Sequence, residues 1–459
     1  MFLSSYNYND HRLSVKDKLY ILCITLISIF LKILWISRIE GTPVSDFETY
    51  YKIAINIANG KGHSFLGNPI AFQGMGYPSF LGVIYKIFST NSIFTGKVIN
   101  LILSVLTLFI IFLILKKILP NKVSLMICYT IIALLPNYIG YNNVLGSEVL
   151  TLFLMCTLIC IMVYDIPFVL KIILLGIITG LLSLTKPFFL VYPLLIAIIE
   201  WLNKKQIKHA LLTCFSTFLI TALIVSPWTY RNYKLFHRFI PISYNGGYVL
   251  FINNNSSNST GAWMPISKIS VSEETIKEMA KAGLTYGCSQ EEEGNEVLFN
   301  PQLEPVLKSA AKKWIIRNPA SFVKLGIKRI ENTFFNGAGD IIAWGANSIN
   351  YSSSSEGFIH SYIFIRICSL LVNFLGFVGI ISLLYYLPKV FIAFFNTHSK
   401  IEYYIAIPFI NIAFFVLIAF VFEGQQRYNF PALWLFTIYL SLPIAFIYKK
   451  LNKKKSKYI

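Results

Sequence analysis

The sequence predicts an all-α protein that crosses a membrane many times, and three observations carry that prediction. Hydrophobic residues make up 55% of the 459-residue chain and charged residues only 13%, a balance unlike that of soluble globular proteins. Long apolar runs recur along the whole chain. Lysine and arginine gather in short tracts between these runs, where they mark cytoplasmic turns. The net charge of +19 therefore indicates a membrane partner and no nucleic-acid partner.

The alternation of charge orders the expected spans, which number about ten, with nine to twelve compatible with the pattern. Arg12 and Lys16 place the N-terminus in the cytoplasm, and the basic tract 203–209 marks another cytoplasmic turn. The turn at 165–171 carries both charge signs and is ambiguous. The expected spans are residues 18–37, 92–115, 123–140, 147–164, 167–185, 187–202, 210–227, 361–386, 403–421 and 430–448.

The stretch 45–62 follows the first span and is too polar to cross a bilayer. Ser45 and Glu48 have the spacing of a capping box, which predicts a helix that starts at Asp46. Gly60 predicts its end. The apolar residues between fall on one side, so we expect a short amphipathic helix that lies on the membrane surface. The macrodipole at its N-terminus favours an ionised Asp46.

Short motifs in a fixed order carry a resemblance to a known class of enzymes. The acid before the tyrosine-rich helix is followed by an N-G-x-G turn at 59–62 and by Gly76-Tyr77-Pro78. This arrangement resembles the membrane-embedded GT-C glycosyltransferases, in particular bacterial relatives of protein O-mannosyltransferases and of the aminoarabinose transferase that modifies lipid A. The match continues with Ser147-Glu148, Lys186-Pro187, Pro227-Trp228-Thr229-Tyr230-Arg231-Asn232, Asn318-Pro319 and Glu423-Gly424-Gln425-Gln426-Arg427-Tyr428.

The resemblance implies a GT-C-type bundle of transmembrane helices and a catalytic aspartate in the first external loop, which here is Asp46. Transfer from a polyprenyl-phosphate sugar needs a base for the acceptor hydroxyl and cations for the leaving phosphate. The expected topology places such groups together at the external membrane boundary, where charged side chains need partners or water. Besides Asp46, we expect Glu48 and Glu148 as second acids, Lys186, Arg231 and Arg427 as ligands of the donor phosphate, and Tyr50, Tyr51, Tyr77 and Glu423 in the substrate pocket.

The hydrophilic residues divide the chain into three parts. Residues 1–227 are expected to form an N-terminal transmembrane catalytic module, which includes the external loop 38–90. Residues 228–360 contain 13 Lys or Arg and 11 Asp or Glu and predict a small extracytoplasmic domain, with a mobile loop at the asparagine-rich tract near 255. Residues 361–459 are expected to supply the last spans and a basic cytoplasmic tail.

No metal ion or other cofactor is expected. Cys156 and Cys160 are four residues apart but have no histidine or carboxylate beside them, and no histidine-rich cluster indicates zinc. A divalent cation held by Asp46 and Glu148 is the alternative. Cys288 is the one cysteine expected in an external loop, so we expect no intrachain disulfide there. Nucleotide-binding loops are missing from the sequence, which favours a lipid-linked donor.

These features together predict an inverting glycosyltransferase of the bacterial cytoplasmic membrane, active on its extracytoplasmic face. It would move a sugar from a polyprenyl-phosphate donor to a hydroxyl of a lipid, glycan or protein acceptor, among membrane lipids. A transporter or flippase of lipid-linked glycans is one alternative, although such proteins usually show internal repeats, and we find none. A glycan polymerase or ligase is the other, and it would act on the same face with a longer donor.

Overall fold

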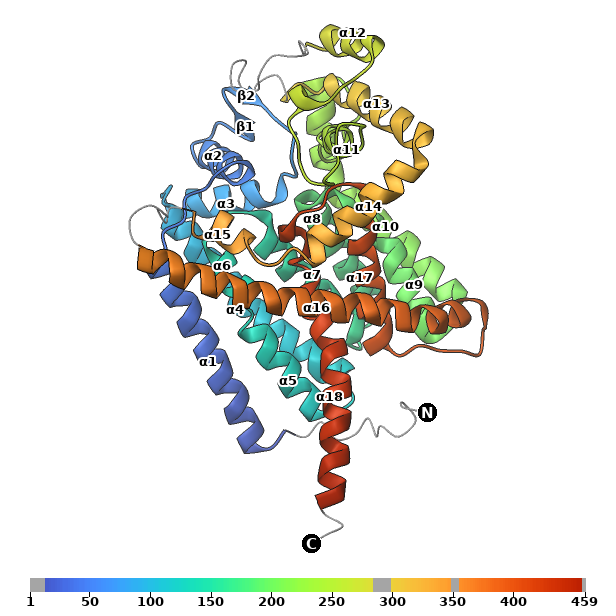
Figure 1. Cartoon of the computed structure of the whole chain (residues 1–459). Helices are drawn as coiled ribbons and strands as arrows, with labels where there is room; N and C mark the ends of the chain where they lie inside the picture. Colours follow the sequence, from blue (N-terminus) through green and yellow to red (C-terminus); the bar gives the residue numbers. More distant parts are fainter. Residues whose placement is uncertain (1–12, 284–298, 348–354, 456–459) are drawn as a thin grey trace.

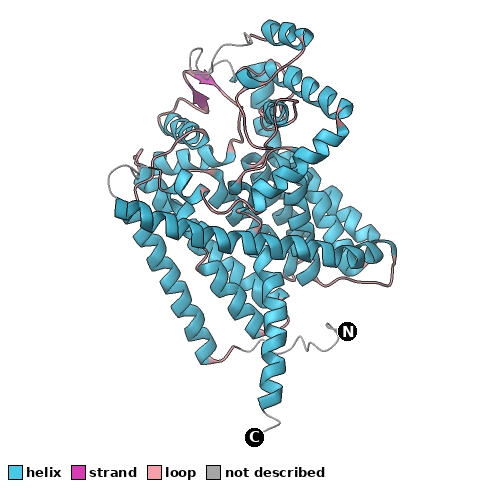
Figure 2. Ribbon diagram, viewed as in Figure 1, coloured by secondary structure: helices cyan, strands magenta, loops and turns pink. Residues whose placement is uncertain are grey.

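Helices form almost all of the regular structure in this computed structural model, which describes residues 13–283, 299–347 and 355–455 (Figures 1 and 2). Within these residues the single sheet is an antiparallel pair of two-residue strands, β1 (Ser64–Phe65) and β2 (Asn68–Pro69). The expected all-α fold class is therefore confirmed. Cys288 lies outside the described residues, and the six cysteines within them are free.

Seven described helical segments are long and apolar enough to cross a membrane, so the chain is a multi-pass membrane protein. An eighth segment consists of α5 (Lys122–Ala133) and α6 (Pro136–Gly140) with the turn after them, bent by 48°. Two shorter apolar helices, α7 (Ser147–Val163) and the first part of α18 (Leu433–Lys455), coincide with the remaining expected spans. The seven long ones are α1 (Val15–Arg38), α4 (Ile93–Ile118), α8 (Phe168–Thr185), η2 with α9 (Pro187–Val191 and Tyr192–Lys204), α10 (Ile207–Phe236), α16 (Ser355–Phe395) and α17 (Tyr403–Val421).

Burial separates an inner helix of the bundle from the outer ones. Most residues of α7 are buried, because α4 and α8 pack against it. In contrast, α1 exposes large apolar side chains such as Leu22, Leu26 and Phe30, the pattern of a helix that faces lipid. The start of α1 and the end of α18 lie at the same end of the bundle, and α11 to α13 lie at the opposite end (Figure 1).

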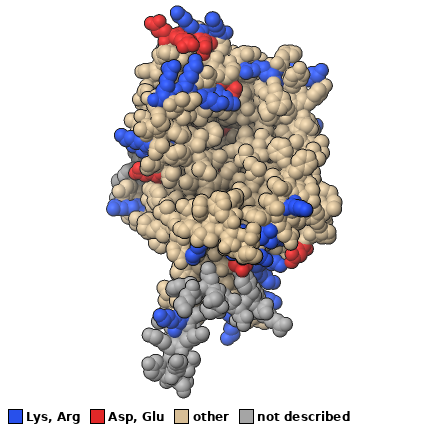
Figure 3. Space-filling view, turned by 90° about the vertical axis from the view of Figure 1, so that its right-hand side faces the viewer, with Lys and Arg blue, Asp and Glu red and all other residues tan. Residues whose placement is uncertain are grey.

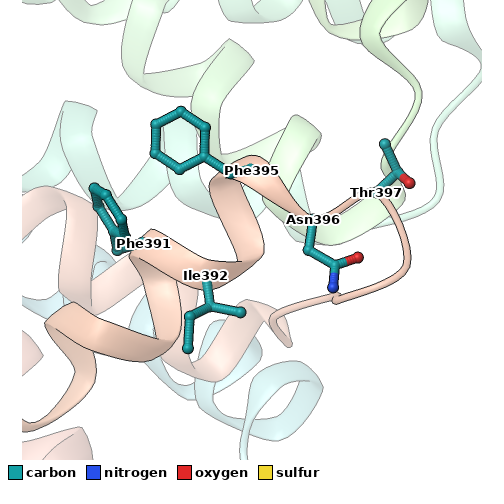
Figure 4. A pocket seen from close by; sticks show the side chains of 5 residues that line it. All are labelled: Phe391, Ile392, Phe395, Asn396 and Thr397. Atoms are coloured by element: carbon teal, nitrogen blue, oxygen red, sulfur yellow. The ribbon is translucent and has the colours of Figure 1, made fainter.

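The lateral surface has the charge distribution of a membrane protein. In the face shown in Figure 3, lysine, arginine and acidic side chains gather near the upper and lower ends, and the band between them consists mostly of other residues. The long helix α16 runs obliquely across the bundle, at a steep angle to α18 (Figure 1). Its C-terminal end borders an apolar pocket of about 530 Å³ (Figure 4). The pocket is lined by Phe391, Ile392, Phe395, Asn396 and Thr397.

Residues 228–283 and 299–347 form a helical cap, part of which has a small core of its own. Helix α10 continues through Pro227 to Phe236, beyond the expected end of the span. A separate cluster of buried residues, among them Phe251, Met279 and Leu307, holds together α11 (Gly246–Asn253), α12 (Glu273–Lys281) and α13 (Leu303–Arg317). The other two cap helices, α14 (Pro319–Phe334) and α15 (Asp340–Gly345), pack with Phe334 and Ile341 on the core of the bundle.

The asparagine-rich tract is part of this core, and the mobile loop expected there is wrong. Asn254, Asn255 and Asn258 are buried, and their side chains bond backbone carbonyls and amides of the same tract. Short amide side chains can satisfy backbone groups locally, which favours an ordered turn. The sequence pattern of a loop therefore encodes a rigid, hydrogen-bonded turn.

Arg329 on α14 fastens the cap to the end of α17. Its buried guanidinium donates to the carbonyls of Phe420 at 2.7 Å and Val421 at 3.2 Å, and to the carbonyl of Asn253. The carbonyls at the end of α17 have no partner within their own helix, so Arg329 both caps α17 and holds the cap domain. A Cβ on Gly424 would lie 2.5 Å from the Cα of Arg329, so the chain after α17 passes directly over this arginine.

We expect the cap to be reached only from outside the cell and the start of α10 only from inside. Ser270→Cys and Lys208→Cys place single thiols at exposed positions of the cap and of the first turn of α10, in a variant lacking the seven native cysteines. A membrane-impermeant maleimide added to intact cells should label position 270 and not position 208. Labelling of position 270 only after the membrane is opened would reverse the topology.

Candidate functional site

The site begins at the first residue of α2 (Asp46–Ala58), as the sequence predicts. The capping box is wrong, however, because Ser45 makes no side-chain cap hydrogen bond. Its backbone has φ 54° and ψ −129°, whereas a capping residue is normally extended. Glu48 instead pairs with Lys52 at 2.7 Å, one helical turn on, and its side chain is 48% exposed. Glu48 therefore faces solvent.

Both carboxylate oxygens of Asp46 have partners from distant parts of the chain. Oδ1 accepts a hydrogen bond from Nε2 of Gln73 at 2.8 Å, and Oδ2 accepts one from Nη2 of Arg427 at 2.8 Å. The Arg427 side chain is 11% exposed and the Asp46 side chain is 37% exposed. The carboxylate is thus fixed in position, yet accessible to a molecule that approaches from the protein surface.

Aromatic rings hold the Arg427 guanidinium in place. Its Cζ lies 5.5 Å from the ring centre of Phe47, 5.8 Å from that of Trp344 and 5.1 Å from that of Tyr428. Phe47 is the residue after Asp46, and Trp344 belongs to α15 in the cap. Nε of Arg427 is buried without a hydrogen-bond partner. The guanidinium therefore keeps a donor that an additional anion can use.

A second ion pair lies at the same boundary. Glu148, at the start of α7, is 3% exposed, and its Oε1 accepts from Nζ of Lys186 at 3.3 Å. The ammonium of Lys186 is 5.9 Å from the centre of the Tyr428 ring, so Lys186 and Arg427 flank one phenol. A Cβ on Gly146 would lie 2.4 Å from Phe47 and 2.5 Å from Oε2 of Glu148, so only glycine allows this approach.

Glu423 supplies the third acid of the site. Its two oxygens accept hydrogen bonds from the side chains of Gln425 and Tyr428, the latter at 3.0 Å. Burial raises the pKa of Glu423 above its ordinary value, and the nearby Arg427 opposes that rise. The turn after α17 thus carries an acid and the main cation only four residues apart.

The structure places Arg231 apart from these groups, unlike the sequence prediction. Its guanidinium donates to the carbonyls of His63 at 2.8 Å and Ile70 at 3.0 Å, and it stacks on Trp228 at 4.4 Å. Its donors therefore fasten the loop 63–72 to α10. We remove Arg231 from the expected ligands of the donor phosphate.

The three tyrosines expected in the substrate pocket lie in different surroundings. Tyr50 and Tyr77 are buried and pack edge to face, with ring centres 6.0 Å apart. Burial is the main cause that raises the pKa of Tyr50, and Asp46 and Glu148 add to it, which places this phenol beside both acids. Tyr51 instead donates to the carbonyl of Asn91 at 2.6 Å. Tyr50 and Tyr77 thus belong to the site, whereas Tyr51 fixes the end of α3 (Gly76–Ile87) and the loop after it.

Sequence reasoning missed several residues of the site. Gln73 lies just before the Gly76-Tyr77-Pro78 motif, which was the only available signal for it. Asp340, at the start of α15, is 3% exposed and accepts a hydrogen bond from the hydroxyl of Tyr141. Its backbone N–H donates to Oε1 of Gln426 at 2.9 Å, next to Arg427. Burial raises the pKa of Asp340 to about 6.

The acids of the site are arranged as partners of cations and hydroxyls. Among the described residues, no group of three or more histidine, cysteine or acidic side chains has an arrangement that could hold a metal ion. Asp46 and Glu148, the pair considered for a divalent cation, each bond a basic side chain. The expectation of no cofactor stays a prediction.

The fold is similar to that of solved glycosyltransferase structures. The apo oligosaccharyltransferase of Archaeoglobus fulgidus superimposes with a TM-score of 0.52 at 14% identity, over 97% of this chain and 52% of that one. The same enzyme, AglB, with an inhibitory peptide and a dolichol-phosphate gives 0.49 at 15% identity, over 96% and 52%. ArnT from Cupriavidus metallidurans bound to undecaprenyl phosphate gives 0.46 at 12% identity, over 94% and 79%.

The likeness to the apo oligosaccharyltransferase shows the fold, and the expected GT-C-type bundle is confirmed at that level. The chain spans about half the length of the oligosaccharyltransferase. No protein-family model matches the sequence, and no curated protein matches it either.

We expect Asp340→Asn to stabilise the protein increasingly as pH rises. An acid whose pKa is higher in the folded state stabilises the fold below its unfolded pKa, and this contribution is lost as pH rises through the folded pKa. A rise from 3.8 to about 6 corresponds to about 3 kcal/mol. Asparagine still accepts from Tyr141 and does not ionise. Thermal unfolding in detergent should therefore show a gain over wild type at about pH 7.5 that is absent at about pH 4.

Asp165→Asn is the matched control, because the Asp165 side chain is 99% exposed. Its effect on the unfolding temperature should be small at both pH values. An equal effect of Asp340→Asn at both pH values would show that Asp340 does not titrate in this range.

Proposed function

We propose that this multi-pass membrane protein with a GT-C fold is an inverting glycosyltransferase. It moves a sugar from a polyprenyl-phosphate donor to a hydroxyl of a lipid, glycan or protein acceptor. The reaction takes place at the extracytoplasmic face of the bacterial cytoplasmic membrane. The likeness to the oligosaccharyltransferase supports the fold, and the residues at the start of α2 support the chemistry.

One observation carries the proposal: a half-open carboxylate and two cations meet at the boundary between bundle and cap. Asp46 is held at 2.8 Å by Gln73 and by Arg427, and Lys186 lies on the same phenol as Arg427. A carboxylate beside cations that can bind phosphate is what displacement at a sugar phosphate requires. A purely structural ion pair would not need the exposure of Asp46.

The reaction follows from these positions. The acceptor oxygen attacks the anomeric carbon while a carboxylate oxygen of Asp46 takes the hydroxyl proton. The bond between that carbon and the phosphate oxygen breaks, and its electron pair stays with the phosphate. One displacement inverts the anomeric centre. Arg427 and Lys186 bind the charge that develops on the leaving polyprenyl phosphate.

No cofactor enters this reaction, and the alternative with a divalent cation has a direct test. If a cation held by Asp46 and Glu148 were required, chelation with EDTA would abolish transfer and Mg²⁺ or Mn²⁺ would restore it. We expect transfer to continue in EDTA.

We expect Asp46→Asn to lower the rate of sugar transfer by about 10² to 10⁴, because it removes the general base. Asparagine has nearly the same size, its oxygen can accept from Arg427, and its amide nitrogen can donate to the side-chain oxygen of Gln73 once that amide turns over, so folding should be unchanged. The assay measures release of polyprenyl phosphate from synthetic polyprenyl-phosphate sugars by the purified protein.

Glu48→Gln is the matched control, because it also replaces a carboxylate by an amide, two residues further along α2. The Glu48 side chain is 48% exposed and forms its ion pair with Lys52. It should keep most of the activity. An inactive Glu48→Gln together with an active Asp46→Asn would assign the base to the other acid.

The two arginines predicted from sequence should now behave differently. Arg427→Lys loses the planar guanidinium at the site, so the affinity for polyprenyl phosphate should fall about tenfold or more. Arg231→Lys should leave that affinity nearly unchanged, although it loosens the loop 63–72. Titration calorimetry in nanodiscs measures both, and thermal unfolding confirms that each variant is folded. Equal losses in the two variants would return Arg231 to the phosphate site.

A further inference from the structure

The Asp46 carboxylate is not ready to act as a base in this structure. Oδ2 receives a charge-assisted hydrogen bond from Arg427 at 2.8 Å, and Oδ1 receives one from Gln73 at the same distance. Each oxygen keeps a second lone pair, but the hydrogen bond from a guanidinium makes that lone pair less available to the proton of an alcohol. Opening the contact with Arg427 would therefore make this carboxylate a stronger base.

Arg427 is the partner that can change. Its Nη2 serves both Asp46 and the hydroxyl of Tyr428, the latter at 3.3 Å, while its buried Nε has no hydrogen-bond partner. The rings around the guanidinium hold its plane without using its donors. A phosphate with several acceptor oxygens can satisfy this cation better than one carboxylate oxygen can.

Gln73 is the partner that stays. The loop that carries it is seated on the end of α8, where a Cβ on Gly74 would lie 2.5 Å from the carbonyl oxygen of Thr185. Lys186 directly follows Thr185 in the chain. The amide of Gln73 is therefore held by backbone packing that does not involve Arg427, and it can keep Asp46 in position when Arg427 turns away.

We infer that the pair formed by Arg427 and Asp46 is a lock that the donor opens. The donor phosphate takes Arg427 away from Asp46, and Gln73 keeps the released carboxylate in place as the base. The base is thus free only when a donor is bound, so the donor binds productively before the acceptor. Gln73 is a positioning residue in this scheme. The inference rests on the proposed function, because it assumes a donor that carries a phosphate.

The lock makes Asp46 a competitor of the donor phosphate for Arg427. Asp46→Asn removes the competing charge, so it should raise the affinity for polyprenyl phosphate by about tenfold, a coupling of ordinary size. The same variant loses transfer. A residue that merely positioned Arg427 for the phosphate would give the opposite result, a weaker affinity. The sign of the change therefore separates the two roles.

The experiment uses the full-length protein in nanodiscs and titrates a short-chain polyprenyl phosphate into wild type, Asp46→Asn, Gln73→Met and Glu48→Gln. The affinity should rise only in Asp46→Asn. In Gln73→Met, affinity should stay near that of wild type while kcat falls by about tenfold or more, because the base is released without its support. Inorganic phosphate is titrated in parallel and should show the same order of affinities at higher concentrations.

An unchanged or weaker affinity in Asp46→Asn would overturn the lock and leave the proposed transferase intact. A Gln73→Met variant with wild-type kcat would overturn the positioning role. If wild type bound no polyprenyl phosphate at any concentration, both the lock and the proposed function would be wrong. These outcomes distinguish failure of the inference from failure of the function on which it rests.

Discussion

The hydrogen-bonded ion pair between Asp46 and Arg427 is the contact on which the arrangement of this protein depends. It joins residues 381 positions apart, one just after α1 and the other in the turn between α17 and α18. Placing two charges at the edge of the hydrocarbon is costly unless they are paired. The helices before and after these residues must therefore bring both loops to one point, and this point becomes the site.

The charges around that pair do not balance. Asp46, Glu148 and Glu423 meet two cations, Arg427 and Lys186. Burial raises the pKa of Glu423 above its ordinary value, and the nearby Arg427 opposes that rise. Three aromatic rings lie around the Arg427 guanidinium, and the Tyr428 ring also lies near the Lys186 ammonium. Such rings stabilise a positive charge without neutralising it. In the proposed reaction, these two cations are the groups that would bind the phosphate of the donor.

The cap is a structural part of the site. Asp340 and Trp344 on α15 contact Tyr141 and Arg427, and Gln426 bonds the backbone at the start of α15. Arg329 fixes the cap to the end of α17, immediately before the turn that carries Glu423. A movement of the cap would therefore displace the groups that contact Arg427 and its neighbour Gln426. The division of the chain at residue 228, expected from composition, does not separate the functional groups.

The sequence by itself determined the properties that local patterns encode. Apolar runs and basic tracts placed the membrane segments, and a polar stretch ending at Gly60 placed the helix that begins at Asp46. The order of short motifs indicated the fold and put Glu148, Lys186 and Arg427 at one boundary. Hydrophobic periodicity and turn chemistry act over a few residues, so they can be read without the fold.

Only the tertiary structure decided which of these groups meet. Two arginines at the same membrane boundary looked equivalent, yet Arg427 bonds Asp46 while Arg231 bonds loop carbonyls. Ser45 and Glu48 had the spacing of a capping box, but the backbone at Ser45 turned away from it. Gln73 had only the nearby Gly76-Tyr77-Pro78 motif as a signal, and Asp340 had none. Their roles arise from contacts between segments distant in sequence, and such contacts are fixed by how the helices pack.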